Sequence, residues 1–132
     1  MSKNFTFIIP VYNEQDAIIE VIQQIKKLHI KKEIIVIDDC SNDNTQLQCS
    51  KIDKIIYKRS LQNFGYGYSI KQGIKIAKYD NLVILDGDNT YPIDEFLNLK
   101  KKFDDGFDMV IGKRIGKNLN LSLVSKYLTV MI

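Results

Sequence analysis

Residues 33–37 read Glu33-Ile34-Ile35-Val36-Ile37, so four β-branched apolar residues follow one another without a polar residue between them. A strand with one face in water alternates apolar and polar residues, whereas a strand covered by helices on both faces is apolar throughout. We therefore interpret this stretch as an inner strand of a parallel sheet. Two other mainly apolar runs of strand length, Phe5–Val11 and Leu82–Leu85, extend the same interpretation to other parts of the chain.

Helical patterns separate these apolar runs. Apolar residues recur at helical spacing within residues 17–28 and again within residues 70–77. Pro92 suits the first turn of a third helix, whose apolar face extends to Phe103. This order indicates βαβ units, and the predicted fold class is α/β, with a mostly parallel sheet flanked by helices. Weaker patterns predict strands at 55–57 and 107–111 and the start of an amphipathic helix within 121–132.

Length and composition indicate a single globular domain and exclude several other classes of protein. The 132 residues leave room for one domain, and a chain that is 45% hydrophobic and 27% charged can bury a core. No apolar run approaches the roughly 18 residues that a membrane-spanning helix needs, so we expect no such segment. Cys40 and Cys49 have only His29 as a possible metal-binding partner, so we expect no disulfide framework and no zinc site, and a cytoplasmic location is the default.

The net charge of +3 comes from scattered lysines. Only Arg59 and Arg114 are arginines, and the one lysine triplet, Lys100–Lys102, lies within a helical pattern. Such a triplet is typical of a solvated helix face, and no basic run is interleaved with aromatic residues as in proteins that bind single strands. We therefore expect no nucleic-acid partner.

Polar residues collect where the predicted strands end, and the most informative of them are Asp86 and Asp88. In open α/β sheets, ligands bind at the carboxyl ends of the strands. Two carboxylates separated by Gly87 can converge on one hard cation, because Mg²⁺ and Mn²⁺ favour oxygen ligands from carboxylates, substrate phosphates and water. The small residue between them lets a ligand approach the backbone closely. The pattern predicts a cation that bridges a diphosphate.

Other strand ends carry groups suited to the rest of such a ligand. Residues 12–14 follow the first strand, and Asp38 and Asp39 follow the second, where a carboxylate can accept hydrogen bonds from a base or from ribose hydroxyls. Arg114, after the strand predicted at 107–111, is a fixed cation suited to phosphate oxygens. We interpret Asn42–Thr45 as ordinary turn and cap residues.

Three familiar phosphate-binding or phosphate-accepting sites are excluded. Ile70 stands where a dinucleotide-binding fingerprint requires its third glycine, and Asn118 stands where a P-loop requires serine or threonine. In a phosphoacceptor receiver domain the acidic pair follows the first strand, whereas Asp38 and Asp39 follow the second. The segment Asn63–Gly73 is therefore interpreted as a turn into a helix that packs closely on the sheet.

Five segments carry these polar residues in order along the chain: Ile8–Glu14, Ile37–Thr45, Asn63–Gly73, Leu85–Asp88 and Gly112–Arg114. Together they resemble glycosyltransferase family 2, and within it the dolichol- or polyprenyl-phosphate sugar synthases. The resemblance spans nearly the whole chain. It implies a GT-A (Rossmann-like) fold, a nucleotide-sugar donor, a divalent metal ion and inversion at the anomeric carbon.

The resemblance also implies roles for single residues. Asp86 and Asp88 are implied to be the catalytic carboxylates that hold Mg²⁺ or Mn²⁺ and the diphosphate, with Gly87 against the donor. Arg114 is implied to meet the phosphates. Many relatives have glutamine as a third metal ligand where this chain has Thr90. The remaining implied donor contacts are Pro10, Tyr12, Glu14, Ile37, Asp38, Asp39 and Asn63.

Family members continue well beyond the position of Ile132, so we expect residues 1–132 to be a single donor-binding domain truncated at its C-terminus. The expected activity is transfer of a sugar from a UDP- or GDP-linked donor to an acceptor, with a polyprenyl or dolichyl phosphate at the cytosolic membrane surface as the expected acceptor. Such chemistry belongs to cell-envelope glycan synthesis. A non-catalytic nucleotide-sugar-binding module, or a remnant without the acceptor half, stays open as the alternative.

Overall fold

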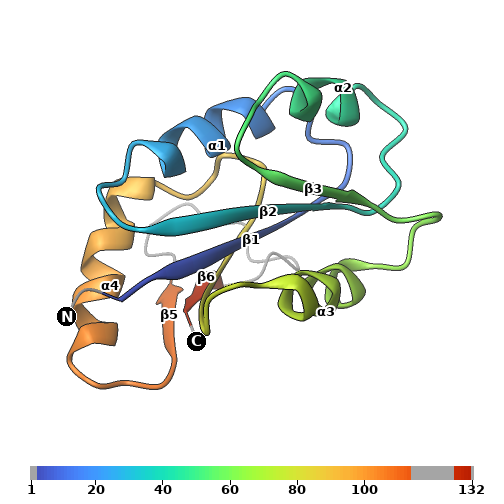
Figure 1. Cartoon of the computed structure of the whole chain (residues 1–132). Coiled ribbons are helices and arrows are strands. Elements are labelled where there is room, and N and C mark those ends of the chain that lie inside the picture. The colour runs from blue at the N-terminus through green and yellow to red at the C-terminus, as the bar shows by residue number, and fades with distance from the viewer. Residues whose placement is uncertain (1–2, 114–126, 132) are drawn as a thin grey trace.

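The computed structural model describes residues 3–113 and 127–131 of the chain. In this part, one sheet has the strand order β3-β2-β1-β4-β6-β5 and helices on both faces (Figure 1). In chain order the elements are β1 (Phe5–Val11), α1 (Ile18–Lys26), β2 (Lys32–Asp38), α2 (Thr45–Ser50), β3 (Ile56–Arg59), α3 (Tyr66–Ile76), β4 (Asn81–Leu85), η1 (Ile93–Glu95, a 3₁₀ turn), α4 (Phe96–Asp104), β5 (Val110–Lys113) and β6 (Tyr127–Met131).

The centre of the sheet is parallel, as the apolar runs predicted. β1 pairs in parallel with β2 on one side and with β4 on the other, and β3 pairs in parallel with β2. Every residue of β1 is buried. The register places Val11 beside Asp38, so β1 and β2 end at the same level. The expected α/β fold class, a mostly parallel sheet flanked by helices, is confirmed.

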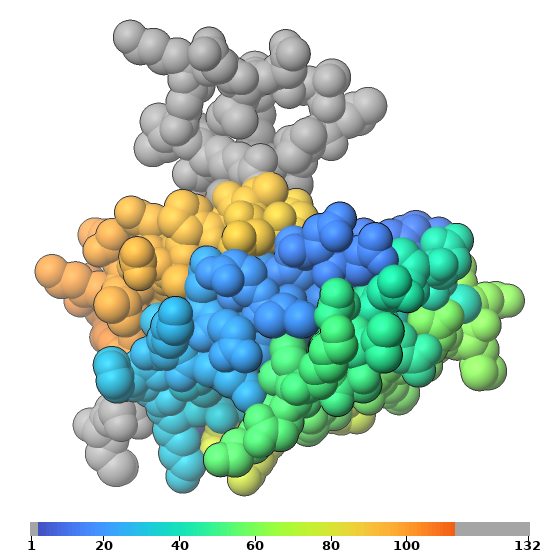
Figure 2. Space-filling view, turned by 90° about the horizontal axis from the view of Figure 1, so that it is seen from above, coloured from blue at the N-terminus to red at the C-terminus, as the bar shows by residue number. Residues whose placement is uncertain are grey.

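Alternate side chains of β1 pack against helices on opposite faces of the sheet. On one face, Phe5 meets Phe96 of α4 edge to face at 5.8 Å between ring centroids, in a core cluster that also contains the apolar side of α1. On the other face, Ile8 lies against Gly73 of α3. Figure 2 looks onto the first face, where α1 (blue) and α2 (blue-green) lie side by side and α4 (orange) lies on the other side of α1. Within the described residues, the helices are too short or too polar to cross a membrane.

Residues 127–131 form a strand, where the pattern within 121–132 predicted the start of an amphipathic helix. β6 pairs antiparallel with both β4 and β5. It covers an edge of β4 that would otherwise expose unpaired N–H and C=O groups. A short apolar run has no period that separates strand from helix, so the neighbouring strands decide. The helix prediction is wrong for these residues, and 121–126 lie outside the described ones.

The structure differs from the sequence-based prediction at two further short elements, β5 and α2. β5 begins at Val110, whereas the predicted strand began at Phe107, and both Phe107 and Met109 are more than half exposed. α2 was not predicted, because six residues with only Thr45 and Cys49 buried show no helical period.

Gly73→Ala should destabilise the fold, because a Cβ there would stand 2.4 Å from Cγ2 of Ile8. Overpacking of this kind costs about 1–3 kcal/mol of unfolding free energy, which urea denaturation measures. Gly67→Ala is the matched control on the same helix, since its Cβ would meet nothing within 4 Å. The control should gain about 0.5–1 kcal/mol from reduced backbone entropy in the unfolded chain. Equal effects of the two substitutions would contradict the packing of α3 on β1.

Candidate functional site

A cavity of about 270 Å³ lies at the carboxyl ends of β1, β2 and β4. Its wall comes from separate parts of the chain: the end of β1 and the loop after it, the residue after β2, the first turns of α3, and the loop after β4. The cavity is therefore built where the parallel strands end, the position expected for a ligand in an open α/β sheet. The lining residues are Pro10, Val11, Tyr12, Glu14, Asp39, Tyr66, Ser69, Asp86, Gly87 and Asp88.

Asp39 ties the end of β2 to the start of α3. Its two carboxylate oxygens accept hydrogen bonds from the backbone N–H groups of Phe64 and Gly65, each at 2.8 Å. The side chain is 5% exposed. Gly65 has a φ of 101°, a left-handed conformation that favours glycine, and α3 begins at the next residue. Asp39 thus shapes one wall of the cavity, and its contact with base or ribose stays a prediction.

A hydroxyl side chain donates a hydrogen bond to Asp86 and another to Asp88. The Tyr66 hydroxyl donates to Oδ1 of Asp86 at 3.0 Å. Oδ1 of Asp88 accepts from the backbone N–H of Thr90 at 3.0 Å and from its hydroxyl at 2.7 Å. Thr90 therefore orients Asp88 by closing a local turn.

The donor set of this edge fits a hard divalent cation that also binds a ligand. Asp86 and Asp88 supply carboxylate oxygens on one cavity wall. Among residues 3–113 and 127–131, no group of three or more His, Cys, Asp or Glu side chains forms a protein-only metal site. Mg²⁺ is usually held by one or two carboxylates together with substrate phosphates and water. The cavity provides that partial set, and its ligand would have to complete it.

Gly87 is required by the core below the cavity. A Cβ on this residue would stand 2.6 Å from Cγ1 of Val11 and 3.4 Å from Cδ1 of Ile18. The missing side chain therefore points into the core, while the backbone of Gly87 lines the cavity. The structure thus explains the glycine by its close packing on the apolar core, and the predicted close approach of a ligand to its backbone stays a prediction.

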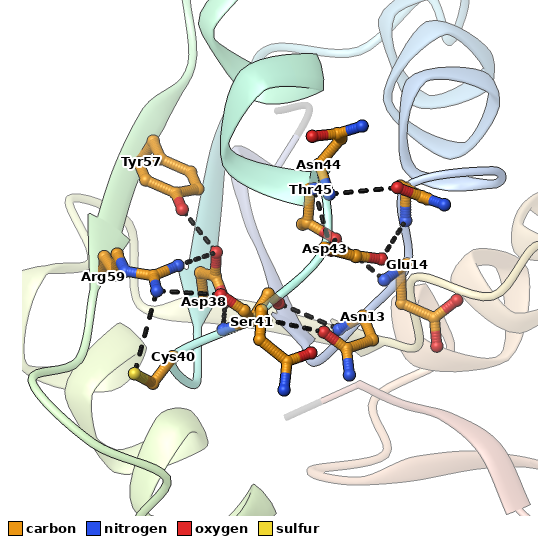
Figure 3. Close-up of polar contacts among 12 residues, drawn as sticks. Asn13, Glu14, Asp38, Cys40, Ser41, Asp43, Asn44, Thr45, Tyr57 and Arg59 are labelled. Atoms are coloured by element: carbon orange, nitrogen blue, oxygen red, sulfur yellow. Dashed lines mark hydrogen bonds and ion pairs between the residues drawn. The ribbon is translucent and has the colours of Figure 1, made fainter.

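The loops after β1 and β2 are joined by hydrogen bonds between residues 13–15 and 41–45, which we call the loop zipper (Figure 3). Each of the three backbone N–H groups of 13–15 donates to a side chain of the other loop. Two bonds run the other way, from the N–H groups of 42 and 44. The bonds are Asn13 N to Ser41 Oγ (2.8 Å), Glu14 N to Thr45 Oγ1 (2.9 Å), Gln15 N to Asp43 Oδ2 (3.2 Å), Asn42 N to Asn13 Oδ1 (2.9 Å) and Asn44 N to Gln15 Oε1 (3.0 Å).

The loop zipper gives the polar run after β2 its role. These residues were interpreted as turn and cap residues, and Asp43 does accept from the N–H of Thr45 at the start of α2. In addition they hold the backbone of Asn13 and Glu14, which continues from Tyr12 at the cavity wall. Asn13 has a φ of 54°, which asparagine tolerates better than most residues.

Asp38 lies outside the cavity, in a buried network on the other side of β2. Its side chain is 0% exposed; Oδ1 accepts from the N–H of Ser41 at 2.8 Å, and Oδ2 accepts from the Tyr57 hydroxyl and from Nη1 of Arg59 at 3.2 Å. Arg59 also donates from Nη2 to the Ser41 carbonyl at 2.8 Å (Figure 3). Burial, followed by the hydrogen bond to Asp38, raises the pKa of Tyr57. The structure thus gives Asp38 a structural role in place of the predicted donor contact.

Two other predicted donor contacts, Ile37 and Asn63, do not line the cavity. Ile37 is fully buried within the sheet, so its side chain does not reach a ligand. Asn63 is exposed on the loop before α3. Arg114 lies outside the described residues.

Tyr66 and Ser69 line the cavity but were not among the predicted site residues. Both belong to the first turns of α3. The only signal in the sequence was their place just after the glycine turn of Asn63–Gly73, which sequence reasoning used for the turn alone. Burial, followed by the charge of Asp86, raises the pKa of Tyr66, so its hydroxyl is a hydrogen-bond donor at neutral pH.

Glu14 adds a fourth carboxylate to the cavity wall, beside Asp39, Asp86 and Asp88. Figure 3 shows it pointing away from the loop zipper. Burial raises its pKa, and the negative charges of Asp88, Asp43 and Asp86 raise it further, in that order. Ionisation of Glu14 therefore destabilises the folded state. The raised pKa indicates a concentrated negative potential at this edge of the sheet, which a bound cation would reduce.

The family model described as Glycosyl transferase family 2 matches residues 6–129. The chain belongs to glycosyltransferase family 2. The match begins in β1 and ends within β6, so it covers all or part of every strand of the sheet.

Three solved structures share the fold of this chain. S. aureus TarS 1-349 in complex with UDP-GlcNAc is 27% identical, with a TM-score of 0.67 over 95% of this chain and 37% of that chain. The mannosyltransferase PcManGT from Pyrobaculum calidifontis, in complex with GDP-Man and Mn²⁺, is 23% identical, with a TM-score of 0.62 over 74% of this chain and 31% of that one. Glucosyl-3-phosphoglycerate synthase from Mycobacterium tuberculosis, in complex with UDP, is 20% identical, with a TM-score of 0.60 over 74% and 38%.

These similarities confirm the GT-A fold that the resemblance implied. The chain spans less than two fifths of the length of each of these three structures. The roles of the residues that line the cavity therefore stay predictions.

Asp38→Asn should lower the free energy of unfolding by about 2 kcal/mol, because it weakens charge-assisted hydrogen bonds to a fully buried group. Asp53→Asn removes the same charge from an exposed pair with Lys26, where the side chain of Asp53 is 88% exposed, and should have no measurable effect. Urea denaturation of both variants measures the difference. If Asp38→Asn left stability unchanged but abolished nucleotide binding, Asp38 would be a ligand contact and its structural role would be wrong.

Glu14→Gln should stabilise the chain at neutral pH. The pKa of Glu14 is raised in the folded state, so ionised Glu14 opposes folding at pH values above that raised pKa. The gain should shrink as the pH falls and vanish below the ordinary pKa of 4.5, where glutamate is protonated in both states. Thermal unfolding of both proteins across this pH range measures the effect. A gain that is independent of pH would contradict the electrostatic cause.

Proposed function

We propose that the chain binds a nucleotide-sugar donor in the cavity of about 270 Å³, together with a divalent cation at Asp86 and Asp88. One observation carries the proposal: carboxylates that follow β2 and β4, far apart in the sequence, line a single cavity in a member of glycosyltransferase family 2. A bound cation would neutralise negative charge on the diphosphate as it leaves the sugar.

The roles follow from position. Asp86 and Asp88 lie in the loop after β4, and we assign them to the cation and the diphosphate. Asp39 and Tyr12, on the β1–β2 side, take the nucleoside end of the donor. Arg114 is assigned to the phosphates from the sequence pattern alone.

The identity of the donor is supported by the structures with the same fold. TarS was solved in complex with UDP-GlcNAc, and PcManGT in complex with GDP-Man and Mn²⁺. We therefore propose a UDP- or GDP-linked sugar as donor, with Mg²⁺ or Mn²⁺ as cofactor and inversion at the anomeric carbon as the outcome.

For the acceptor we propose a polyprenyl or dolichyl phosphate. Attack by a sugar hydroxyl benefits from a general base, whereas a phosphate is already an anion and needs only positioning and charge stabilisation. Such a lipid acceptor would place the protein in the cytoplasm, peripherally on the membrane, within cell-envelope glycan synthesis. The cavity itself accounts for donor binding alone, so a non-catalytic donor-binding module is the second candidate. Sugar transfer to an added lipid phosphate distinguishes the two.

Isothermal titration of the chain with UDP and GDP, with and without Mn²⁺, tests the proposal. We expect nucleotide binding that depends on Mn²⁺, and loss of at least about tenfold in affinity when Asp86→Asn and Asp88→Asn are combined. Asp80→Asn is the matched control, since Asp80 is exposed before the opposite end of β4. Absence of binding of either nucleotide to the wild-type chain under all conditions would refute donor binding.

A further inference from the structure

Tyr66 reaches across the cavity from α3 to the loop after β4. Its hydroxyl donates to Oδ1 of Asp86 at 3.0 Å, and its ring lines the cavity. The residue as a whole is 56% exposed, so packing around the ring alone does not explain why it takes this position. The hydrogen bond to Asp86 is the one polar contact that its hydroxyl makes among the hydrogen bonds of the described residues.

The start of α3 is fixed to β2 independently of Tyr66. Asp39 accepts from the N–H groups of Phe64 and Gly65, and the hydroxyl of the fully buried Ser69 donates to the carbonyl of Gly65 at 3.2 Å. The backbone on both sides of Tyr66 is therefore anchored by hydrogen bonds within the protein. These bonds fix the point from which the phenol side chain extends, before any ligand binds.

A carboxylate in a partly exposed loop has several side-chain rotamers, and only some present an oxygen to a cation. A hydrogen bond to Oδ1 restricts these rotamers. Because the two oxygens of a carboxylate are rigidly joined, the same bond also fixes the direction in which Oδ2 points. Carboxylates that ligate metal ions are commonly held by such hydrogen bonds, whose loss typically weakens metal affinity by about 10–100-fold.

We propose that Tyr66 is a positioning residue that fixes the Asp86 carboxylate for cation binding, and that the start of α3 thereby links Asp39, on the nucleoside side, to Asp86, on the cation side. The inference rests on the proposed function, because it assumes a cation at Asp86 and Asp88. Two carboxylates assigned to different parts of the donor are thus connected through two backbone amides and one phenol.

The test is Tyr66→Phe, which removes one oxygen atom and keeps the ring. Electron paramagnetic resonance measures the affinity for Mn²⁺ in the presence of saturating UDP or GDP, without any need for catalysis. We expect Mn²⁺ to bind about tenfold more weakly than to the wild-type chain. Tyr68→Phe is the control, because Tyr68 lies on the same helix and packs its ring on Phe64 at 4.4 Å between centroids. It should leave Mn²⁺ affinity unchanged.

A second variant separates positioning from direct contact with the ligand. If Tyr66 acts through Asp86, then adding Tyr66→Phe to Asp86→Asn should cause no further loss of Mn²⁺ affinity. A further loss in that background, an equal loss in Tyr68→Phe, or unchanged affinity in Tyr66→Phe would each overturn the inference while the proposed function stands. A wild-type chain that binds neither nucleotide with Mn²⁺ would overturn both.

Discussion

The parallel register between β1 and β2 is the constraint on which the site depends. Val11 lies beside Asp38, and the N–H of Asp39 donates to the carbonyl of Val11 at 2.9 Å, so the two strands stay aligned for one residue beyond the sheet. From this level the two loops leave together and are joined by the loop zipper. A different register would separate Tyr12 and Glu14 from Asp39, and the cavity would lose one of its walls.

The acidic edge of the sheet is stable because most of its carboxylates have dedicated donors. Asp38 has Tyr57, Arg59 and a backbone amide, and Asp39 has two backbone amides. The remaining negative charge is directed into the cavity, where Glu14 has a raised pKa. Buried charges that are paired stabilise the fold, whereas the charges that raise the pKa of Glu14 mark a place where a cation is favourable.

Sequence reasoning succeeded where a residue's role depends on its place along a strand. The acidic pair after Leu82–Leu85 lies on the cavity wall because the ends of parallel strands meet at one edge. It did not separate Asp38, which is buried outside the cavity, from Asp39, which lines it, because successive side chains along a strand point to opposite sides and chemistry alone does not say which one faces the ligand. It also missed Tyr66, whose contact depends on how α3 leaves its turn, and β6, whose conformation depends on the strands beside it.

The loop zipper also limits how this protein could be altered. Its bonds join particular backbone groups of each loop to particular side chains of the other, so a single residue inserted into either loop would break several of them. Diversity in natural or engineered descendants is therefore better tolerated as side-chain replacement than as change in loop length. Tyr12 lines the cavity, is 45% exposed and is not a member of the zipper. It is a position at which ligand preference could evolve while the scaffold is retained.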